Sequence, residues 1–484
     1  MTSQSVDIAI IGAGTAGQTA YREAVKSTDS VLMINQHSWG TTCAHVGCMP
    51  SKLLIAAANR AHEIQHAEVF GLHGSVKIDG VAVMQRVRKE RDRFTQGVID
   101  AVNDWPERHR MSGHAVLKDQ HTIHVGGKHT ISAKKIVIAT GSSPVVPKDW
   151  KDAIGERLLT TDSIFELDDL PHSIAVIGAG AVGLELAQAL HRLGVKVTVF
   201  NRSDTLGTLT DPVLQANAHA VLGKELTLVL NSSIDRVEAH DQRARLFYTD
   251  REGQSHQGTF DYVLCAMGRK PNLTSMHLDQ LGIELDEHGQ PTAFDPLSGQ
   301  ISDTALFMAG DVNGFRPLLH EAANQGHHAG NNAGRYPDIR RVPQQVSMSM
   351  VFCEPQMAMV GQSYADIHQR LVEHDEAFSV GSACFVSQGR SNVMAVNQGA
   401  MRVYGQAKTG KLLGAEIFGP AAEHLAHLLA WAMQHDMTVA QMLDSPFYHP
   451  VIEEAVRTAL RDLQRAMSMG PVPVKGCLDC GAGA

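Results

Sequence analysis

Two segments far apart in the chain share one order of apolar strand, glycine-rich turn and helix. Residues 6–11 (VDIAII) form a continuous apolar run, as expected for a strand buried on both faces, and lead directly into GAGTAG at 12–17. A helical stretch and a second apolar strand at 31–34, ending at Asn35, follow. The same order returns as a strand at 173–177, GAGAVG at 178–183, a helix at 184–193 and a strand at 195–200 that ends at Asn201. The pattern predicts a duplicated α/β unit.

The spacing within the two copies supports this duplication. From the third glycine to the asparagine the interval is 18 residues in both copies, and each copy closes on a strand with Gly-x-x-Pro, at 136–144 and 262–271. From the first glycine to the closing glycine the interval is 129 residues in the first copy and 90 in the second. The extra residues of the first copy begin near Cys43 and Cys48.

Each G-x-G-x-x-G sequence lies between a predicted strand and a predicted helix, which is the context of a dinucleotide-binding loop. The first glycine permits a tight turn, the second lets a pyrophosphate approach the backbone, and the third lets the helix pack against the strand. The helix start offers amide donors and a positive dipole end to the phosphates. The alternative is a pair of unliganded turns, but two matched copies favour two dinucleotide sites with electron transfer between them.

Both copies depart from the fingerprint at its acidic position. About 20 residues after the loop, an Asp or Glu usually binds the ribose hydroxyls, whereas this chain has Asn35 and Asn201. Asparagine can still bond a hydroxyl, but it does not repel a 2′-phosphate, and Arg202 could pair with one. The usual basis for preferring NAD over NADP is therefore weakened at the second site.

A cysteine pair carries the most informative chemistry. Cys43 and Cys48 precede Pro50, which favours the first turn of a helix predicted to continue through 52–62. A helix start and the nearby Lys52 lower a thiol pKa and favour the reactive thiolate, and the spacing permits a local disulfide. The alternatives are two buried free thiols or half of a zinc site, for which no complementary pair lies nearby.

Seven motifs in order, spanning residues 5 to about 465, resemble the flavin-dependent class I pyridine nucleotide–disulfide oxidoreductases, most closely the dihydrolipoamide dehydrogenases. They are GAGTAG (12–17), CAHVGCMPSK (43–52), ATG (139–141), GAGAVGLELA (178–187), GRKPN (268–272), LFMAGDV (306–312) and HPVIEEA (449–455). The resemblance implies an α/β fold with two Rossmann-like domains, for FAD and for NAD or NADP, and a C-terminal α+β dimerisation domain. Thr41 departs from a glycine common in the family.

The resemblance also implies roles for single residues. Gly12, Gly14 and Gly17 would hold the FAD pyrophosphate, and Gly178, Gly180 and Gly183 that of the nicotinamide nucleotide. Cys43 would exchange with substrate and Cys48 would face the flavin. Lys52 would lie near the flavin N5 and pair with Glu185, for which the alternative is a solvated charge on an amphipathic helix. Asp311 would hold the ribityl chain, and the helix carrying His320 would present its backbone to the flavin. The predicted cofactor-binding set also contains Ala115, Thr140, Gly141 and Gly268.

His449 and Pro450 precede the last strong helical pattern, and Pro450 suits a first helical position. Glu453 or Glu454 can reach back to His449 and fix its tautomer, and histidine titrates in the range needed to move a thiol proton. The alternative is a helix-start histidine with ordinary first-turn acids. The resemblance assigns His449 as the base and Glu454 as its partner, serving Cys43 of a second subunit. Because Glu453 adds a second carboxylate, the sequence leaves the orienting residue open.

Composition narrows the class of protein. The chain has 484 residues, 43% of them hydrophobic, with a formal net charge of −9, which excludes disorder and argues against a nucleic-acid-coating protein. No apolar run reaches the length of a membrane span, and the first residues lack a signal-peptide pattern. We therefore expect a soluble, cytoplasmic protein without a membrane or nucleic-acid partner, although a transit peptide removed earlier stays an alternative. The 26 histidines contain no H-E-x-x-H or similar set, so no metal site is expected.

Three functions compete. The first is oxidation of dihydrolipoamide carried on a lipoyl domain, through the disulfide and FAD to NAD, by a homodimer associated with a 2-oxo acid dehydrogenase complex. The second is an NAD(P)H-dependent disulfide or mercuric reductase that uses Cys477 and Cys480 of the C-terminal tail, beyond a Pro-Val-Pro-Val linker. The third is mainly structural, as a subunit of an acyltransferase complex. We predict an FAD domain at 1–153 and 271–345, a nicotinamide domain at 154–270, an interface domain at 346–465 and a flexible tail at 466–484.

Overall fold

The computed structural model describes residues 2–373, 377–406 and 408–468. The chain separates into two compact units, one of Met1–Leu53, Gln85–Val145 and Gly268–Gln344, the other of Leu54–Met84, Val146–Met267 and Gln345–Ala484. The first glycine loop and the cysteine pair belong to the first unit, and the second glycine loop and His449 belong to the second. The division into three domains stays a prediction, and Cys477 and Cys480 lie outside the described residues.

The first unit is built on a seven-stranded sheet, in the order β3-β2-β1-β6-β5-β4 with β17 beside β6. The strands β1, β2, β6 and β17 run parallel, so their carboxyl ends lie at the same edge of the sheet. The strands are β1 (Thr2–Ile11), β2 (Val31–Asn35), β3 (Arg110–Ser112), β4 (Ala115–Leu117), β5 (Thr122–Val125), β6 (His129–Ile138) and β17 (Leu306–Met308); the short pair β7 (Ser142–Pro144) and β16 (Arg269–Pro271) forms a separate ribbon.

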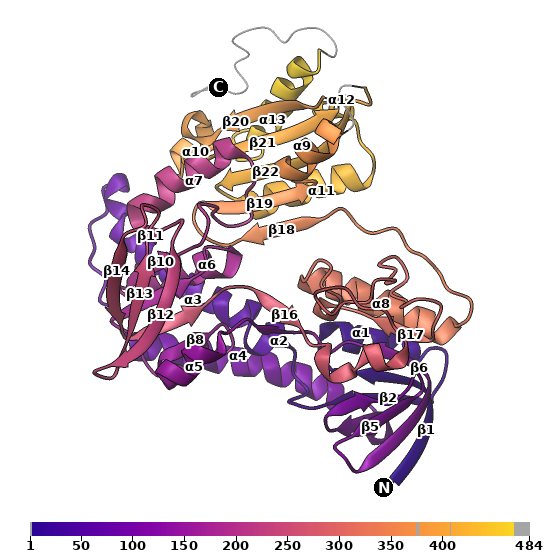
Figure 1. The fold of residues 1–484 in the computed structure, drawn as a ribbon. Coiled ribbons are helices and arrows are strands. Elements are labelled where there is room, and N and C mark those ends of the chain that lie inside the picture. The colour runs from indigo at the N-terminus through magenta and orange to yellow at the C-terminus, as the bar shows by residue number, and fades with distance from the viewer. Residues whose placement is uncertain (1, 374–376, 407, 469–484) are drawn as a thin grey trace. The chain divides into compact units, whose positions relative to one another are not determined.

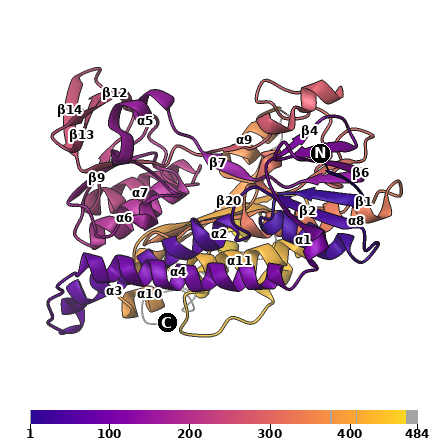
Figure 2. The same ribbon diagram turned by 90° about the horizontal axis from the view of Figure 1, so that it is seen from below.

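The predicted burial of β1 on both faces is confirmed. Ile8 and Ile10 pack with the helices on one face, while Ala9 and Ile11 belong to the core on the other. The covering helices are α1 (Thr15–Ala24) and α8 (Leu319–Arg335), which lie side by side in Figure 2. They approach closely because α8 presents glycines: a Cβ on Gly326 would lie 2.2 Å from the Ala16 carbonyl oxygen.

The second unit repeats the arrangement with a parallel sheet in the order β11-β10-β9-β15-β8. Its predicted strand at 173–177 and helix at 184–193 are confirmed as β9 and α6, although the helix begins three residues earlier. The elements are β8 (Leu158–Thr160), β9 (Ser173–Ile177), β10 (Lys196–Phe200), β11 (Thr227–Val229), β15 (Tyr262–Cys265), α5 (Lys148–Ile154), α6 (Ala181–Arg192) and α7 (Pro212–Glu225), with an antiparallel sheet of β12 (Ser233–His240), β13 (Arg243–Thr249) and β14 (Ser255–Phe260).

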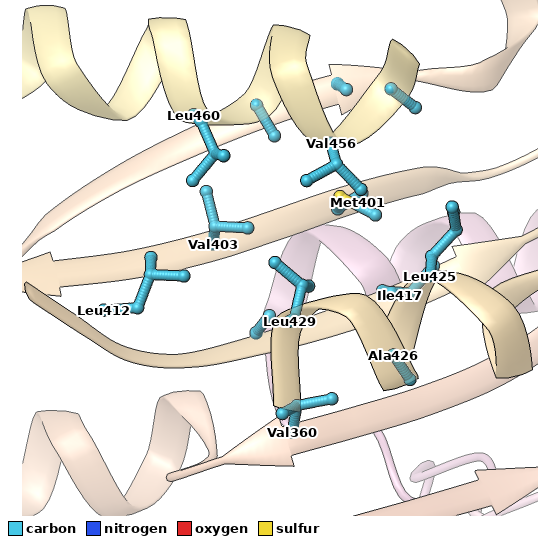
Figure 3. Packing of buried hydrophobic residues seen from close by; sticks show 14 of the residues in the cluster. Val360, Met401, Val403, Leu412, Ile417, Leu425, Ala426, Leu429, Val456 and Leu460 are labelled. Carbon is cyan, nitrogen blue, oxygen red and sulfur yellow. The ribbon is translucent and has the colours of Figure 1, made fainter. Parts of the chain in front are cut away.

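The C-terminal part of the second unit is an antiparallel sheet in the order β18-β19-β22-β21-β20, seen in Figure 1 with its helices. Leu425 and Leu429 of one helix and Val456 and Leu460 of another are buried with Val403 of the sheet (Figure 3). The elements are β18 (Met348–Val351), β19 (Gln356–Gly361), β20 (Ser379–Cys384), β21 (Ala400–Gln406), β22 (Lys411–Gly419), α9 (Tyr364–Glu373), α10 (Gly389–Val393), α11 (Ala422–Gln434), α12 (Val439–Leu443) and α13 (Glu454–Ala466).

The extra residues of the first nucleotide-binding copy form three helices. Short α2 (Thr42–His45) carries Cys43, and α3 (Cys48–Gln65) begins at Cys48, so the predicted helix start near Pro50 is confirmed. Long α4 (Gly80–Asn103) follows and precedes β3 in the chain. Within the described part of the chain, no helix has the length and apolar character needed to cross a lipid bilayer.

A buried carboxylate joins the segment before α7 to the C-terminal sheet. Glu416 of β22 is fully buried and accepts hydrogen bonds from the backbone N–H groups of Thr210, Asp211 and Tyr364 and from the Thr210 hydroxyl, at 2.6–3.0 Å. Asp211, also fully buried, accepts from Arg402 and from the Tyr404 hydroxyl. These bonds fix the segment before α7 against the C-terminal sheet within this unit.

We expect Glu416→Ala to destabilise the protein by about 3–5 kcal/mol, because it leaves four buried or partly buried donors without an acceptor. Denaturant unfolding followed by circular dichroism measures the change. Glu252→Ala, which removes a carboxylate that is 53% exposed, is the matched control and should change stability by less than about 0.5 kcal/mol. Equal stability of the two variants would contradict the structural role of Glu416.

Candidate active site and nucleotide-binding loops

The first glycine loop has three glycines in three different environments. Gly12 has φ +105°, and a Cβ there would lie 2.3 Å from the Ala139 carbonyl oxygen. A Cβ on Gly17 would lie 1.9 Å from the Gly12 carbonyl oxygen, whereas a Cβ on Gly14 would have no heavy atom within 4 Å. The outer two positions therefore need glycine for the turn and for helix packing, and the middle one leaves the backbone open to a ligand.

The second loop reproduces these environments. A Cβ on Gly178, at φ +112°, would lie 2.4 Å from the Ala266 carbonyl oxygen, and one on Gly183 would lie 2.0 Å from that of Gly178. Gly180 is open, like Gly14, and the two have nearly equal backbone angles of −70°, −176° and −72°, −174°. Neither α1 nor α6 has a side-chain N-cap or an acidic residue in its first turn. Both helix starts therefore suit the pyrophosphate of a dinucleotide.

The two asparagines at the strand ends hold backbone. Asn35 Oδ1 accepts from Ala13 N at 3.2 Å, and its Nδ2 donates to the carbonyls of His37 and Ser38. Asn201 Oδ1 accepts from Ala179 N at 3.3 Å, and its Nδ2 donates to Ser203 and Thr205. Each asparagine thus links its glycine loop to the turn after the strand, a use that the sequence spacing alone did not indicate. Arg202 is exposed.

The predicted residues near the closing glycine of the first copy are fixed by hydrogen bonds. Thr140 Oγ1 donates to the Asn272 carbonyl at 2.7 Å, and Asn272 donates back to Thr140 and Gly141, the latter at φ +67°. Asp311 accepts from the Ser142 hydroxyl at 2.8 Å, and Ser142 also accepts from Arg269. Asn272 belonged to a quoted motif but had no predicted role.

The remaining predicted cofactor residues of this unit lie on β4, after β15 and on α8. Ala115 is buried at the start of β4, and Gly268 follows β15 with φ +94°. His320 is the second residue of α8 and its side chain is exposed, so nothing in its surroundings gives the imidazole a catalytic partner among the described residues.

The cysteine pair is held as two thiols whose side chains hydrogen-bond each other. Cys43 is half-buried on α2, and Cys48 is exposed at the start of α3. Gly47 lies between them, and a Cβ there would lie 3.2 Å from Cys43 Cα, so a larger residue would press on the pair. Thr41, at the position where the family commonly has glycine, caps α2 by accepting from Ala44 N at 3.3 Å.

The ionisation of the pair differs from the expectation for Cys43. The hydrogen bond to Cys48, burial and the charge of Cys48 all raise the pKa of Cys43, and the positive charge of Lys52 offsets only part of this effect. Lys52 lowers the pKa of Cys43 as predicted, but the hydrogen bond to Cys48 and burial outweigh it, so the prediction of a lowered pKa is wrong for Cys43. The raised pKa favours the protonated form of the Cys43 thiol.

Glu185 is buried on α6, which excludes the alternative of a solvated surface charge. Its Oε1 accepts from the backbone N–H of Phe352 at 2.9 Å. One and two turns further along α6, Gln188 and Arg192 bind Glu354, so one face of the helix holds the segment after β18. Lys52 and Glu185 belong to different units, and their pairing stays a prediction.

His449 has one carboxylate partner. Its Nδ1 lies 3.0 Å from Glu454 Oε1, and Glu454 Oε2 accepts from Val451 N at 3.1 Å. The Glu454 side chain is 9% exposed and that of His449 55%. Glu453 instead lines a surface pocket with His424, His427, Leu428 and Trp431. The open choice between the two glutamates therefore falls on Glu454, and Nε2 of His449 has no hydrogen-bond partner among the residues that the structure describes.

The predicted placement of Pro450 at the first helical position is wrong. α13 begins at Glu454, and residues 451–453 form a turn after the cis peptide between His449 and Pro450. The turn forms because both backbone groups of Val451 are bound by side chains: Glu454 accepts from its N–H, and Gln388 donates to its carbonyl at 2.8 Å. Gln388 was missed because it lies 63 residues away in sequence.

Two family profiles cover most of the chain. The profile described as pyridine nucleotide-disulphide oxidoreductase matches residues 6–326, and that of the dimerisation domain of the same proteins matches 347–460. The chain is 28% identical over 463 residues to the dihydrolipoyl dehydrogenase of Chlamydia pneumoniae, covering 93% of this chain and 95% of that protein. It is 29% identical over 473 residues to the mercuric reductase of Staphylococcus aureus, covering 96% of this chain and 83% of that protein.

Solved structures agree with the fold. LpdA from Mycobacterium tuberculosis superposes with a TM-score of 0.79 at 23% identity, covering 95% of this chain and 99% of that chain. The HOCl-induced flavoprotein disulfide reductase RclA from Escherichia coli, solved as a Cu(II) complex, also gives 0.79, at 22% identity with 94% and 99% covered. With the duplicated glycine loops, the cysteine pair and the C-terminal sheet, these matches confirm the expected fold class. The chain belongs to the pyridine nucleotide-disulphide oxidoreductase family.

Proposed function

We propose that this protein is a dihydrolipoamide dehydrogenase that oxidises dihydrolipoamide on a lipoyl domain through the Cys43–Cys48 disulfide and FAD to a nicotinamide nucleotide. Family membership already makes it a flavin-dependent oxidoreductase that uses FAD and NAD(P). The observation that supports a dithiol substrate is the cysteine pair, whose two sulfurs contact each other where α3 begins. The curated relatives named dihydrolipoyl dehydrogenase support the same substrate.

The residues present fit both dinucleotides. Gly12, Gly14 and Gly17 with the start of α1 would hold the FAD pyrophosphate, and Asp311 the ribityl chain. Gly178, Gly180 and Gly183 with the start of α6 would hold the nicotinamide nucleotide. Both loops leave the middle glycine open and both helix starts uncapped, as a bound diphosphate requires. Bound FAD would supply the two-electron chemistry between the Cys48 sulfur and the nicotinamide.

The thiol chemistry follows from the placement of the two sulfurs. In the oxidised enzyme, a substrate thiolate attacks Cys43 Sγ, the Cys43–Cys48 bond breaks, and Cys48 leaves as a thiolate. The second substrate thiolate then attacks the substrate sulfur of the mixed disulfide, which releases lipoamide and leaves Cys43 reduced. The electron pair lost by the substrate rests on Cys48. The raised pKa of Cys43 favours the protonated form of its thiol after the exchange.

His449 is the base that accepts a proton during these steps. Its Nδ1 is engaged by Glu454, so Nε2 is the nitrogen that takes a proton from a substrate thiol. The buried Glu454 carboxylate stabilises the imidazolium that forms and is itself oriented by Val451 N. Following the family, His449 serves Cys43 of the partner subunit in a homodimer.

The exposed apolar side chains of α11 suit that dimer. Trp431 is 65% exposed and Leu428 42%, one turn apart. We expect the double variant Trp431→Glu, Leu428→Glu to weaken dimerisation by on the order of 10³-fold and to lose dithiol turnover with it. Light scattering coupled to size-exclusion chromatography measures the mass. Val213→Glu on α7, at another exposed apolar position, is the control; a dimeric, active double variant would contradict this interface.

A second candidate is reduction of a disulfide or a soft metal ion with NAD(P)H. It is favoured by the relative named mercuric reductase and by the pair of adjacent thiols, which are ligands that soft metals prefer. In this version Cys477 and Cys480, outside the described residues, relay electrons. Removal of residues 471–484 distinguishes the two: an unchanged lipoamide activity supports the first candidate, and its loss supports a relaying tail.

A third candidate is a mainly structural role within an acyltransferase complex, and we place the protein in the cytoplasm. The deciding experiment is a steady-state comparison of NAD and NADP with lipoamide, glutathione and mercuric ion on the isolated protein. Robust lipoamide turnover without partner proteins supports the proposed function. Lipoamide turnover below that of either control substrate would overturn it.

A further inference from the structure

A positively charged side chain that takes no part in holding the fold together follows the end of β10. Arg202 is exposed and forms no hydrogen bond or ion pair with any residue that the structure describes. It directly follows Asn201, the residue at the position where the fingerprint usually has an acid. Asp204, the nearest carboxylate along the chain, is also exposed and forms no ion pair with Arg202.

Asn201 is uncharged, and its hydrogen bonds leave the side chain no free donor. Its Nδ2 donates to Ser203 and Thr205, while Oδ1 accepts from Ala179 N of the glycine loop. An Asp or Glu in this place would accept from a ribose 2′-hydroxyl and repel a 2′-phosphate. Asn201 carries no charge to repel a 2′-phosphate, and both ends of its amide already bind the glycine loop and the turn after β10. Discrimination at the ribose therefore passes to the next residue.

The first copy provides an internal comparison. Asn35 likewise binds its glycine loop and the turn after its strand, but the residue that follows is neutral Gln36, whose Oε1 lies 2.9 Å from His114 Nδ1. The FAD proposed for this copy has no 2′-phosphate. The two copies thus share the asparagine and differ in charge at the next position, where only the second presents a guanidinium. Guanidinium groups bind phosphate through paired, charge-assisted hydrogen bonds.

We propose that the second nucleotide site takes NADP(H), with Arg202 binding the 2′-phosphate and Asn201 acting as a positioning residue for the glycine loop. The proposal rests on the proposed function, because it specifies the nucleotide of the same site. It makes Arg202 the specificity-determining residue of the chain.

Binding of adenosine fragments tests the proposal without turnover. Calorimetry with the FAD-loaded full-length protein compares 2′,5′-ADP with 5′-AMP, which differ only in the 2′-phosphate. We expect 2′,5′-ADP to bind at least about tenfold more tightly, and Arg202→Ala to bring the two within about threefold. Rising salt should reduce the preference of the wild type. Gln36→Ala, the matched change in the first copy, should leave it unchanged.

A second variant distinguishes loss of the phosphate contact from loss of folding. Asn201→Asp keeps an oxygen for Ala179 N but adds a charge, so we expect it to favour 5′-AMP over 2′,5′-ADP. Equal binding of both fragments by the wild type, or a preference for 5′-AMP, would overturn the NADP proposal while leaving the proposed function intact, provided that NADH still binds. If neither NADH nor NADPH binds, the proposed function itself fails.

Discussion

Cys43→Ser is expected to abolish the oxidation of dihydrolipoamide, with a loss on the order of 10³-fold or more. The hydroxyl cannot form the mixed disulfide, and Cys48 loses the sulfur that contacts it. Reduction of the flavin by the nicotinamide nucleotide should persist, because that half of the reaction does not need the disulfide. Steady-state kinetics with lipoamide and stopped-flow absorbance of the flavin measure the two halves separately.

Cys384→Ser provides the matched control, since Cys384 is an exposed thiol at the end of β20. It should turn over lipoamide at the wild-type rate. If Cys43→Ser kept wild-type turnover, or if both cysteine variants lost activity equally, Cys43 would not be the sulfur that exchanges with substrate.

His449→Gln is expected to lower kcat for dihydrolipoamide by about 10²–10⁴-fold at neutral pH, the usual contribution of a positioned general base. The deficit should shrink as the pH rises towards the thiol range near 8.5–10, because the substrate then ionises without help. A pH profile of kcat for the wild type and the variant measures this convergence. A constant ratio across the range would indicate a structural role instead.

Variants of the two neighbouring glutamates distinguish the orientation of His449 by a bound carboxylate from the general effect of a nearby negative charge. Glu454→Gln should reduce kcat and shift its pH profile, because it removes the carboxylate 3.0 Å from His449 Nδ1. Glu453→Gln changes a side chain that lines the pocket beside Trp431, and we expect kcat within about twofold of the wild type. Larger loss in Glu453→Gln than in Glu454→Gln would contradict the assignment.

Features governed by local pattern were predictable from the sequence. β1, β9 and both glycine loops follow from continuous apolar runs and from glycines, of which the outer two in each loop leave no room for a side chain. The start of α3 beside Cys48 follows from Pro50 and the apolar period after it. These signals lie within a few residues of the structure that they determine.

Features set by distant partners were not predictable in the same way. In the turn before α13, Val451 is bound by Gln388, 63 residues away, and the buried Glu185 is bound by the backbone N–H of Phe352, 167 residues away. A proline before a helical pattern gives no sign of such partners, so Pro450 was assigned to the helix itself. The asparagine side chains were expected to bind a ribose because of their distance from the glycine loops. Sequence spacing does not show that their amide groups already bind backbone atoms.

The most direct test of the account is the absorbance of the FAD-loaded protein when one equivalent of dihydrolipoamide is added without oxygen. The account predicts a new long-wavelength band from the Cys48 thiolate beside the oxidised flavin, absent in Cys48→Ser. Bleaching of the flavin with no such band, or an identical band in Cys48→Ser, would contradict the claim that these two sulfurs carry the electron pair.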